Sequence, residues 1–416
     1  MNIFRNISNH IPYQRSLAPA LLLASVLLAS CGSAAEDTSA DTQIRINTET
    51  EALTESGTEA VRTFTPDTSS ASDTESETAA VTETESETAS DTASTPYDIT
   101  LAFTGDINLD DTWSVMQYAA QQPDGIFDCI DEVLVTAMQD ADLCCINNEF
   151  SFSTRGSAMN GKAYTFRSEP SNVSLLTELG VDLATLANNH VYDYGADAFA
   201  DTLTTLDDAG IAYVGAGMNL AEAMEPFYYE QDGLTIAVVN ATRAEKNVMT
   251  PAASDTSAGV LRCYDTELFE QVIAKASAHA DFVICCVHWG TEYSYELESV
   301  QKETARLYLD AGSDVIVGTH SHCLQGIEYY DGKPIFYSLG NFWFNDKTLE
   351  TGLLLLHVTG DSPESPILSC TFLPAIQENC VTRYAESDAD REAVFGLLNE
   401  ISVNASVDSD GTIREN

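Results

Sequence analysis

The chain of 416 residues carries 65 acidic and 18 basic side chains, and its formal net charge is −47 at pH 7. A surface this acidic argues against nucleic acid as a partner and against unassisted binding of any polyanion, whereas divalent cations concentrate near it. Because residues 97–416 hold 50 of the acidic and only 14 of the basic side chains, the acidity is not confined to the N-terminal segment.

Residues 1–31 predict a lipoprotein signal peptide. A basic start precedes the apolar run Leu17 to Leu28, which is too short to span a bilayer comfortably. The run ends in Leu28-Ala29-Ser30-Cys31, which resembles a bacterial lipobox, so we expect lipidation of Cys31. An ordinary signal peptide with a chance cysteine is the alternative. Lipidation would anchor the protein at the extracytoplasmic face of the cell membrane.

Residues 32–96 are low-complexity sequence rich in Ser, Thr, Glu, Asp and Ala. They lack the apolar side chains that offset chain ordering, so this segment predicts a disordered acidic linker, which like charges keep extended. Residues 97–416 are long for one domain but within the range of a single large α/β fold.

Apolar strands alternate with amphipathic helices in residues 97–416, which predicts an α/β fold. In chain order we expect strand 99–103, strand 142–146, helix 170–179, strand 181–187, helix 196–209, strand 211–214, hairpin 228–239, helix 268–280, strand 282–287, helix 300–311, strand 315–317, hairpin 325–339, strands 352–358 and 368–373, and helix 391–400. The pairs Cys144-Cys145 and Cys285-Cys286 lie within strands, so we expect core residues on opposite faces and not a disulfide framework.

Polar side chains follow the ends of most predicted strands. They are Asp106, Glu149, Asn189, His190, His288, His320 and His322. Ligands of open α/β sheets bind where the carboxyl ends of the strands meet, so we expect one shared crevice. A lone histidine after a strand more often caps or hydrogen-bonds, but His320 and His322 are two apart in extended chain and share one face.

This donor set predicts one or two divalent metal ions. Imidazole, carboxylate and amide oxygen suit Mn, Fe, Zn or Mg, which the sequence does not distinguish, and do not resemble a thiolate site. Two-metal centres with such ligands activate water for in-line attack. His190 could instead act as the general acid that protonates a leaving oxygen. Asp193 and Glu292 are candidates for orienting ligating imidazoles.

Six motifs, in order, resemble the bacterial capsule biosynthesis CapA family. They are Gly105-Asp106, Asn147-Asn148-Glu149, Asn188 to Gly195, His288 to Tyr293, Gly318 to His322 and Tyr337 to Phe342. That family is associated with poly-γ-glutamate capsule synthesis and is related to calcineurin-like metallophosphoesterases. The resemblance covers residues 99–344 and implies a four-layer α/β/β/α metallophosphoesterase-like sandwich. Carried over by position, the metal ligands would be Asp106, Glu149, Asn189, His288, His320 and His322.

The resemblance assigns the acid role to His190, and one departure from the phosphoesterase pattern concerns a metal. That pattern opens with Asp-x-His, whereas this chain has Asp106-Ile107-Asn108, so one ion is expected to bind weakly or not at all. Trp289 and Tyr293 either line a pocket or pack beside His288. Asn341 is expected to hold a loop and not to touch substrate.

The resemblance implies a cell-surface protein of capsule biosynthesis, in which the polymer is like poly-γ-glutamate. It would act as a metal-dependent hydrolase of the phosphoesterase type on an extracellular anionic polymer. The alternative is a non-catalytic accessory subunit of a membrane complex for polymer synthesis or export, and a third is a partner-binding domain with inherited motifs. Expected partners are the membrane, through the lipid anchor, the polymer, and synthase or export subunits.

Overall fold

The computed structural model describes residues 63–64, 96–245 and 249–416. The predicted signal peptide and Cys31 lie outside these residues, as does most of the predicted linker. The described part of the linker includes β1 (Thr63–Phe64). Within the described ranges, no helix is both long and apolar enough to cross a membrane.

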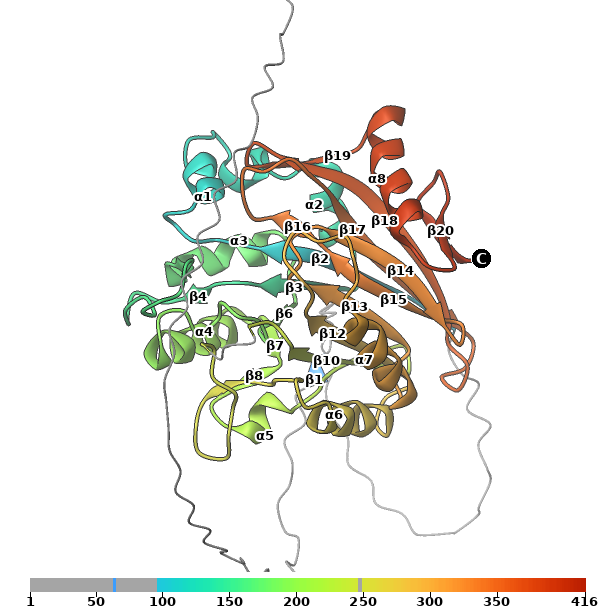
Figure 1. The fold of residues 1–416 in the computed structure, drawn as a ribbon, viewed down its shortest axis with the longest axis horizontal. Coiled ribbons are helices and arrows are strands. Elements are labelled where there is room, and N and C mark those ends of the chain that lie inside the picture. Colours follow the sequence, from blue (N-terminus) through green and yellow to red (C-terminus); the bar gives the residue numbers. More distant parts are fainter. Residues whose placement is uncertain (1–62, 65–95, 246–248) are drawn as a thin grey trace, which may run out of the picture. The chain divides into compact units, whose positions relative to one another are not determined.

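Two large sheets form the centre of the fold (Figure 1). The first has the order β20 (Ala405–Val407), β21 (Thr412–Glu415), β18 (Ile367–Glu378), β17 (Leu349–Gly360), β2 (Tyr97–Ile107), β3 (Leu143–Asn148), β6 (Leu183–Thr185) and β7 (Ala212–Val214), with β16 (Asn341–Trp343) on β2 and β19 (Val381–Tyr384) on β18. The second has the order β1, β9 (Phe227–Gln231), β10 (Leu234–Thr242), β12 (Phe282–His288), β13 (Val315–Thr319), β15 (Lys333–Leu339) and β14 (Leu324–Tyr330).

Parallel pairing brings several strand ends to one place in each sheet. In the first sheet β2, β3, β6 and β7 are parallel neighbours. In the second, β10, β12, β13 and β15 are. The two small sheets pair β4 (Ser151–Phe152) with β5 (Arg167–Ser168) and β8 (Ala216–Gly217) with β11 (Gly259–Val260). The carboxyl ends of parallel strands lie at one edge of each sheet. The predicted polar side chains come directly after these strand ends and therefore lie at that edge.

The helices cover the outer faces of the two sheets (Figure 1). Those packed on the first sheet include α2 (Glu132–Gln139), α3 (Val173–Glu178) and α4 (Ala196–Ala209), and those on the second are α6 (Glu267–Ser277) and α7 (Ser299–Asp310). The remaining helices are α1 (Ser114–Ala119), α5 (Leu220–Ala223), α8 (Asp388–Ile401) and the 3-10 turns η1 (Gly125–Asp128) and η2 (Pro170–Asn172).

Side-chain alternation along the strands divides the core into layers. In β12, Ile284 and Cys286 belong to the cluster between the sheets, whereas Val283 and Cys285 pack with α6 and α7. Strand β3 alternates in the same way, with Cys145 between the sheets and its neighbour on the helix side. The fold is therefore the predicted α/β/β/α sandwich.

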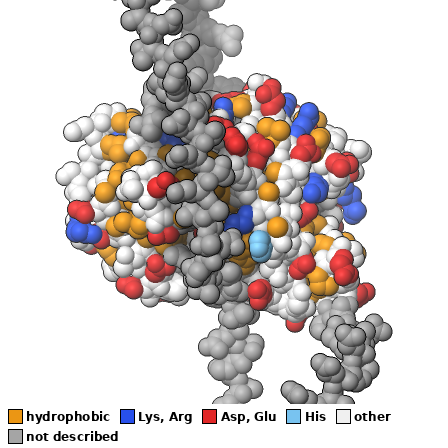
Figure 2. Space-filling model, turned by 90° about the horizontal axis from the view of Figure 1, so that it is seen from below, with side chains coloured by type: hydrophobic (Ala, Val, Ile, Leu, Met, Phe, Trp, Pro, Cys, Tyr) orange, Lys and Arg blue, Asp and Glu red, His pale blue; other side chains and the backbone are white. Residues whose placement is uncertain are grey.

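All nine cysteines after Cys31 are buried and free of disulfides. The prediction that adjacent cysteines face opposite sides of their sheets is confirmed by their places in different core clusters. On the visible part of the face in Figure 2, acidic side chains are scattered and do not form one continuous patch. The acidity is thus spread over this face.

Several predicted elements differ from the structure. Helices α1 and α2 were not expected, because six and eight residues give too short a window for a periodic apolar pattern. The predicted helix 170–179 is a 3-10 turn starting at Pro170 followed by α3. Strands β17 and β18 are 12 residues each, longer than predicted, because their mutual pairing continues past the apolar stretch.

Candidate metal centre

Asp106 enters the space between the sheets because β2 is irregular just before it. The pairing register of β2 with β3 shifts between Phe103 and Asp106, and such a bulge re-aims the side chains that follow. Gly105 allows the irregularity, since a Cβ at this position would collide with the carbonyl oxygen of Gly340. The backbone of Asp106 donates to that same carbonyl, at 2.8 Å. The close approach of two distant segments therefore sets the direction of this carboxylate.

The other candidate ligands lie at or just after strand ends. His288 is the last residue of β12, two residues after Cys286 on the face between the sheets. Glu149 follows β3 directly. His320 and His322 follow β13 with φ values of 92° and 55°. Left-handed backbone is unfavourable for side chains other than glycine, and such strain is concentrated at functional sites.

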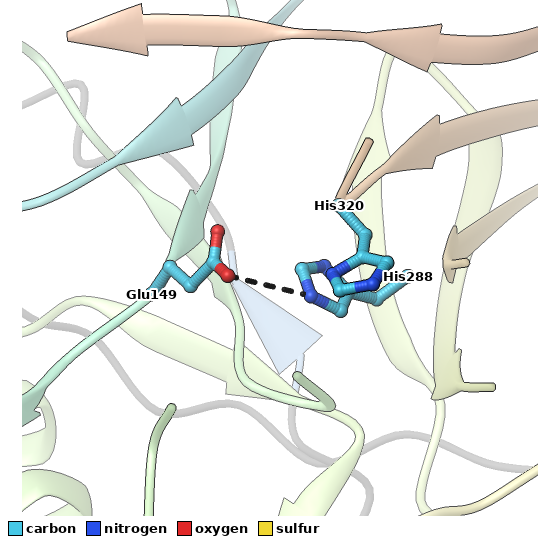
Figure 3. Close-up of side chains that lie close together, drawn as sticks. All are labelled: Glu149, His288 and His320. Atoms are coloured by element: carbon cyan, nitrogen blue, oxygen red, sulfur yellow. Dashed lines mark ion pairs between the residues drawn. The ribbon is translucent and has the colours of Figure 1, made fainter. Parts of the chain in front are cut away.

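The structure brings all six predicted ligands together, and each is buried. Ligand atoms of Glu149, His288 and His320 lie within 4.8 Å of one another, and those of Asp106, Glu149 and His322 do the same. Glu149 belongs to both groups, and Figure 3 shows it projecting toward the imidazoles of His288 and His320.

The sixth predicted ligand, Asn189, lies against this cluster. Its Oδ1 is 2.7 Å from Nε2 of His288. The other ring nitrogen of His288, Nδ1, lies 3.0 Å from Oγ1 of Thr319. An outer partner of this kind sets the orientation of an imidazole and leaves the opposite nitrogen for a ligand. Asn189 and His288 therefore present an oxygen and a nitrogen side by side.

Two ligand atoms in the first group have no hydrogen-bond partner. Oε1 of Glu149 and Nδ1 of His320 are buried and make no hydrogen bond. Buried polar atoms without partners are costly and rare in folded proteins, so each such atom calls for an explanation. Carboxylate oxygens and imidazole nitrogens are ligands for a divalent transition metal. The residues present fit such an ion.

In the second group the imidazole, and one of the two oxygens of Asp106, already have partners within the protein. Asp106 Oδ1 accepts from Nδ2 of Asn147 at 2.7 Å, and Asp106 Oδ2 lies 3.1 Å from Nδ1 of His322. The same His322 nitrogen lies 2.8 Å from Oδ1 of Asn341. Asn108 stands where the phosphoesterase pattern has histidine, and its Oδ1 accepts from the backbone of Asp110 at 2.8 Å. Asp106 Oδ2 makes no hydrogen bond, so an ion bound through this oxygen and Nδ1 of His322 would have to displace the contact of that nitrogen with Asn341.

Burial controls the ionisation of the cluster. It lowers the pKa of His288 well below its usual range and lowers the pKa of His320 to about 3, so both imidazoles stay neutral. Neutral imidazole is the form that binds metal. Burial, together with the Asp106 carboxylate, raises the pKa of Glu149. Burial opposes the protonation of His322, but hydrogen bonding to Asp106 outweighs it and raises the pKa of this imidazole.

His190 and Asp193 form a buried pair next to the cluster. Nδ1 of His190 lies 2.6 Å from Oδ2 of Asp193, and Nε2 lies 3.9 Å from Oε1 of Glu149. Asp193 Oδ2 also accepts from the backbone of Phe166 at 2.8 Å, which holds the carboxylate in place. Burial lowers the pKa of His190, and Asp193 acts in the opposite direction. The pair therefore presents Nε2 of His190 toward the candidate ligands.

Residues 100–346 match the profile of the bacterial capsule synthesis protein family PGA_cap. This chain belongs to that family. The PGA biosynthesis protein CapA of Bacillus subtilis is 37% identical over 204 residues, which are 47% of this chain and 53% of that protein. The capsule biosynthesis protein CapA of Bacillus anthracis is 36% identical over 193 residues, 45% of this chain and 46% of that protein. The chain thus spans about half the length of these two relatives.

A third relative is a probable polyglutamine synthesis accessory protein of Mycobacterium tuberculosis. It is 31% identical over 276 residues, which are 63% of this chain and 72% of that protein. Among solved structures, the NAD nucleotidase of Haemophilus influenzae aligns with a TM-score of 0.40 and 14% identity, over 72% of this chain and 55% of that one. The predicted capsule-family resemblance is confirmed by the profile and the relatives.

Lys162 is a residue of the PGA_cap region that the sequence analysis missed. Its ammonium is buried and lies 2.7 Å from Oδ1 of Asp193 and 3.0 Å from Oε1 of Glu245. It also donates to the backbone carbonyl of Asn189. A single lysine in a loop carries no sequence signal, because its burial depends on the packing of distant segments. Lys162 therefore balances the charge of the carboxylate that holds His190.

Asn147 was also missed as a site residue, although it stands in the quoted motif. Its amide donates to Asp106, and its Oδ1 accepts from Oγ1 of Thr185 at 3.2 Å and Nδ2 of Asn188 at 3.3 Å. The sequence did contain one indication: Asn147 is two residues after Cys145 in the same strand, so both side chains lie on the face between the sheets. Asn147 links three strand ends beneath the candidate ligands.

The remaining motif residues divide between packing and the site. Trp289 is buried, and its indole donates to the carbonyl of Tyr337 at 2.9 Å, so it packs the core. Tyr293 is 40% exposed, and its ring centroid is 5.6 Å from that of His322. Glu292 is exposed, and its negative charge contributes to the raised pKa of His322. It makes no hydrogen bond to an imidazole within the described part of the chain, so its orienting role stays a prediction.

Proposed function

We propose that this chain is a metal-dependent hydrolase of the phosphoesterase type that acts in capsule polymer biosynthesis. The observation that carries the proposal is the buried, unpartnered Oε1 of Glu149, which faces imidazoles across the gap between the sheets. Family membership supports the link to capsule polymer, since the Bacillus relatives are named for capsule and PGA biosynthesis.

In this proposal the six residues of the cluster hold one or two divalent ions. They are Asp106, Glu149, Asn189, His288, His320 and His322. A bound ion of this kind lowers the pKa of water and stabilises charge on a phosphoryl oxygen. The protein contributes preorganised ligands, because Asn147 and Thr319 orient Asp106 and His288 before any ion arrives.

His190 is proposed as the proton donor to the leaving oxygen. Asp193 stabilises the protonated ring through Nδ1, so that Nε2 carries the proton toward the cluster. Lys162 on the other oxygen of Asp193 keeps this buried carboxylate paired. These contacts hold the donor in one orientation, which is what proton transfer at a fixed atom requires.

The location and partners that we propose are those that the sequence predicts. We propose a lipid anchor at Cys31 that places the domain at the extracytoplasmic face of the membrane, where the polymer is made or exported. The second candidate function is a non-catalytic accessory subunit of the synthase or export complex. It is favoured by the name of the mycobacterial relative, a probable synthesis accessory protein.

Metal content and turnover of the full chain test this proposal together. We expect bound transition metal by elemental analysis, and cleavage of a chromogenic phosphodiester that falls at least about a hundredfold in His190→Ala without loss of metal. His279→Ala is the matched control, because His279 is exposed and its Nδ1 lies 2.8 Å from the carbonyl oxygen of Lys275. A metal-free chain rejects the hydrolase. Bound metal with neither phosphoester nor γ-glutamyl cleavage favours the accessory subunit instead.

A further inference from the structure

The ring of Tyr293 lies beside the candidate metal centre, and a backbone hydrogen bond fixes the position of this residue. Its backbone has a φ of 56°, and its N–H donates to the carbonyl of Ser321 at 2.6 Å. That carbonyl lies between His320 and His322, so Tyr293 is tied to the segment that carries both candidate ligands. A tyrosine in left-handed backbone persists only where its surroundings impose it. Its partly exposed ring therefore has a defined place next to His322.

Lys347 lies on the ring of Tyr293. Its Nζ is 3.3 Å from the ring centroid, the geometry of a cation–π contact. Hydrogen bonds of Asn345 hold the segment that carries Lys347. Oδ1 of Asn345 accepts from the backbone N–H of Lys347 at 3.1 Å and from Nε2 of Gln377 at 2.9 Å. Asn345 also donates to the hydroxyl of Tyr293, at 3.4 Å. Ring and ammonium are thus positioned by one hydrogen-bonded network.

The ammonium of Lys347 differs from most basic groups of this acidic chain. Three other lysines of the described residues are paired with carboxylates: Lys162, Lys275 with Glu225, and Lys333 with Asp314. For Lys347, no carboxylate oxygen of the described residues lies within the 4.0 Å that defines an ion pair. A cation that rests on an aromatic face keeps N–H groups for a further partner. In a chain with so many acidic residues, the ammonium of Lys347 is thus left open to an anion from outside.

We propose that Tyr293 and Lys347 form a subsite beside the metal cluster that binds an anionic group of the substrate. The group is a phosphate or carboxylate adjoining the bond that is cleaved. The place of that bond rests on the proposed function, whereas the binding of an anion does not. A phosphodiester polymer and a polyglutamate chain both carry such groups, and both would be repelled by the rest of the acidic surface.

Anion binding to the metal-free full chain tests the subsite directly. Calorimetric titration with pyrophosphate and with γ-linked triglutamate should show about tenfold weaker binding of at least one of them to Lys347→Met, the effect of losing one charge-assisted hydrogen bond. Lys347→Arg should restore the affinity. Lys333→Met is the control, because it removes an equal charge at the opposite ends of the strands. Equal affinities of Lys347→Met and Lys333→Met for both probes overturn the proposal.

Changes at Tyr293 separate the subsite from general charge effects. Tyr293→Leu removes the ring that positions the ammonium and should weaken binding as Lys347→Met does, whereas Tyr293→Phe keeps the ring and should bind normally. If Tyr293→Leu binds both probes like the unchanged chain, the ring has no role and the subsite as proposed is wrong. Loss with pyrophosphate alone assigns a phosphate to the subsite, and loss with triglutamate alone assigns a carboxylate.

Turnover distinguishes failure of the subsite from failure of the hydrolase. The rate of hydrolysis of bis(p-nitrophenyl) phosphate in the presence of Mn²⁺ measures turnover. Binding that depends on Lys347 in a chain without turnover supports the subsite and rejects the hydrolase. If the chain turns over the substrate but its affinity for both anions does not depend on Lys347, the subsite is rejected and the hydrolase proposal is supported.

Discussion

Oε1 of Glu149 lies 3.6 Å from Nε2 of His288, across the gap between the two sheets. One atom comes from the end of β3 and the other from the end of β12, so neither sheet alone contains the site. Both side chains are fully buried, and the carboxylate oxygen makes no hydrogen bond. The pair is therefore costly in the metal-free protein and favourable once a cation lies between the sheets.

Glu149→Gln should change stability and metal binding in opposite directions. Burial and Asp106 raise the pKa of Glu149, so its ionised form destabilises the metal-free fold as pH rises through that raised value. The amide removes the charge, and we expect the metal-free chain to gain about 1–3 kcal/mol at pH 7 while losing metal affinity. Urea unfolding after chelation measures the first effect and metal titration the second. A destabilised metal-free variant would contradict this account of the carboxylate.

His320 should make the metal-free protein sensitive to acid. Its pKa is about 3 when folded and near 6.5 when unfolded, so the unfolded chain gains a proton first and stability falls as pH drops between these values. Relative to His320→Gln, the unchanged chain should lose about 2 kcal/mol between pH 6.5 and pH 5. Parallel slopes of unfolding free energy against pH for the two proteins would show that His320 is not buried in its neutral form.

The two ligand groups should bind ions of unequal affinity. Both groups offer an unpartnered carboxylate oxygen, Glu149 Oε1 and Asp106 Oδ2, but they differ at the imidazole. Nδ1 of His320 has no partner, whereas Nδ1 of His322 must give up its hydrogen bond to Asn341. We expect two steps on titration with Mn²⁺, separated by at least about tenfold, since one net hydrogen bond is roughly 1 kcal/mol. His320→Ala should abolish the tighter step and His322→Ala the weaker one. The reverse pattern would contradict the assignment.

Lys162→Met should be strongly destabilising. The change leaves Asp193 buried without its cationic partner, and breaking a buried pair in this way costs about 3–5 kcal/mol. Arg155→Met is the matched control, because Arg155 pairs with Asp201 at the surface, where solvent screening leaves such pairs little effect on stability. Chemical unfolding of both variants checks the difference, and equal losses would mean that the ion pair of Lys162 is not buried in solution.

Some of the site could be predicted because it follows from local chain properties. His288 and Glu149 come directly after buried strands, and parallel strands bring such residues to one edge. The left-handed backbone of His320 and His322 was not foreseen, since extended geometry was assumed for the pair. They converge all the same, because the loop that carries them is held against Asp106, whose Oδ1 accepts from the backbone of His320 at 3.3 Å.

Other residues could not be found in this way, because their roles depend on contacts between distant segments. Lys162 becomes part of the site only when its loop packs against Asp193 and Glu245. Lys347 reaches Tyr293 only through the network around Gln377. Neither position has a neighbouring pattern that would mark it.

The sequence by itself determined the alternation of the strands, the set of donor groups and their places at strand ends, because these depend on periodicity and side-chain chemistry. Only the tertiary structure decided which atoms meet. The bulge before Asp106, the approach of Gly340 to Gly105 and the facing of Glu149 with His288 all arise from the packing of one sheet on the other. That packing depends on contacts summed over the whole core, which no local pattern specifies.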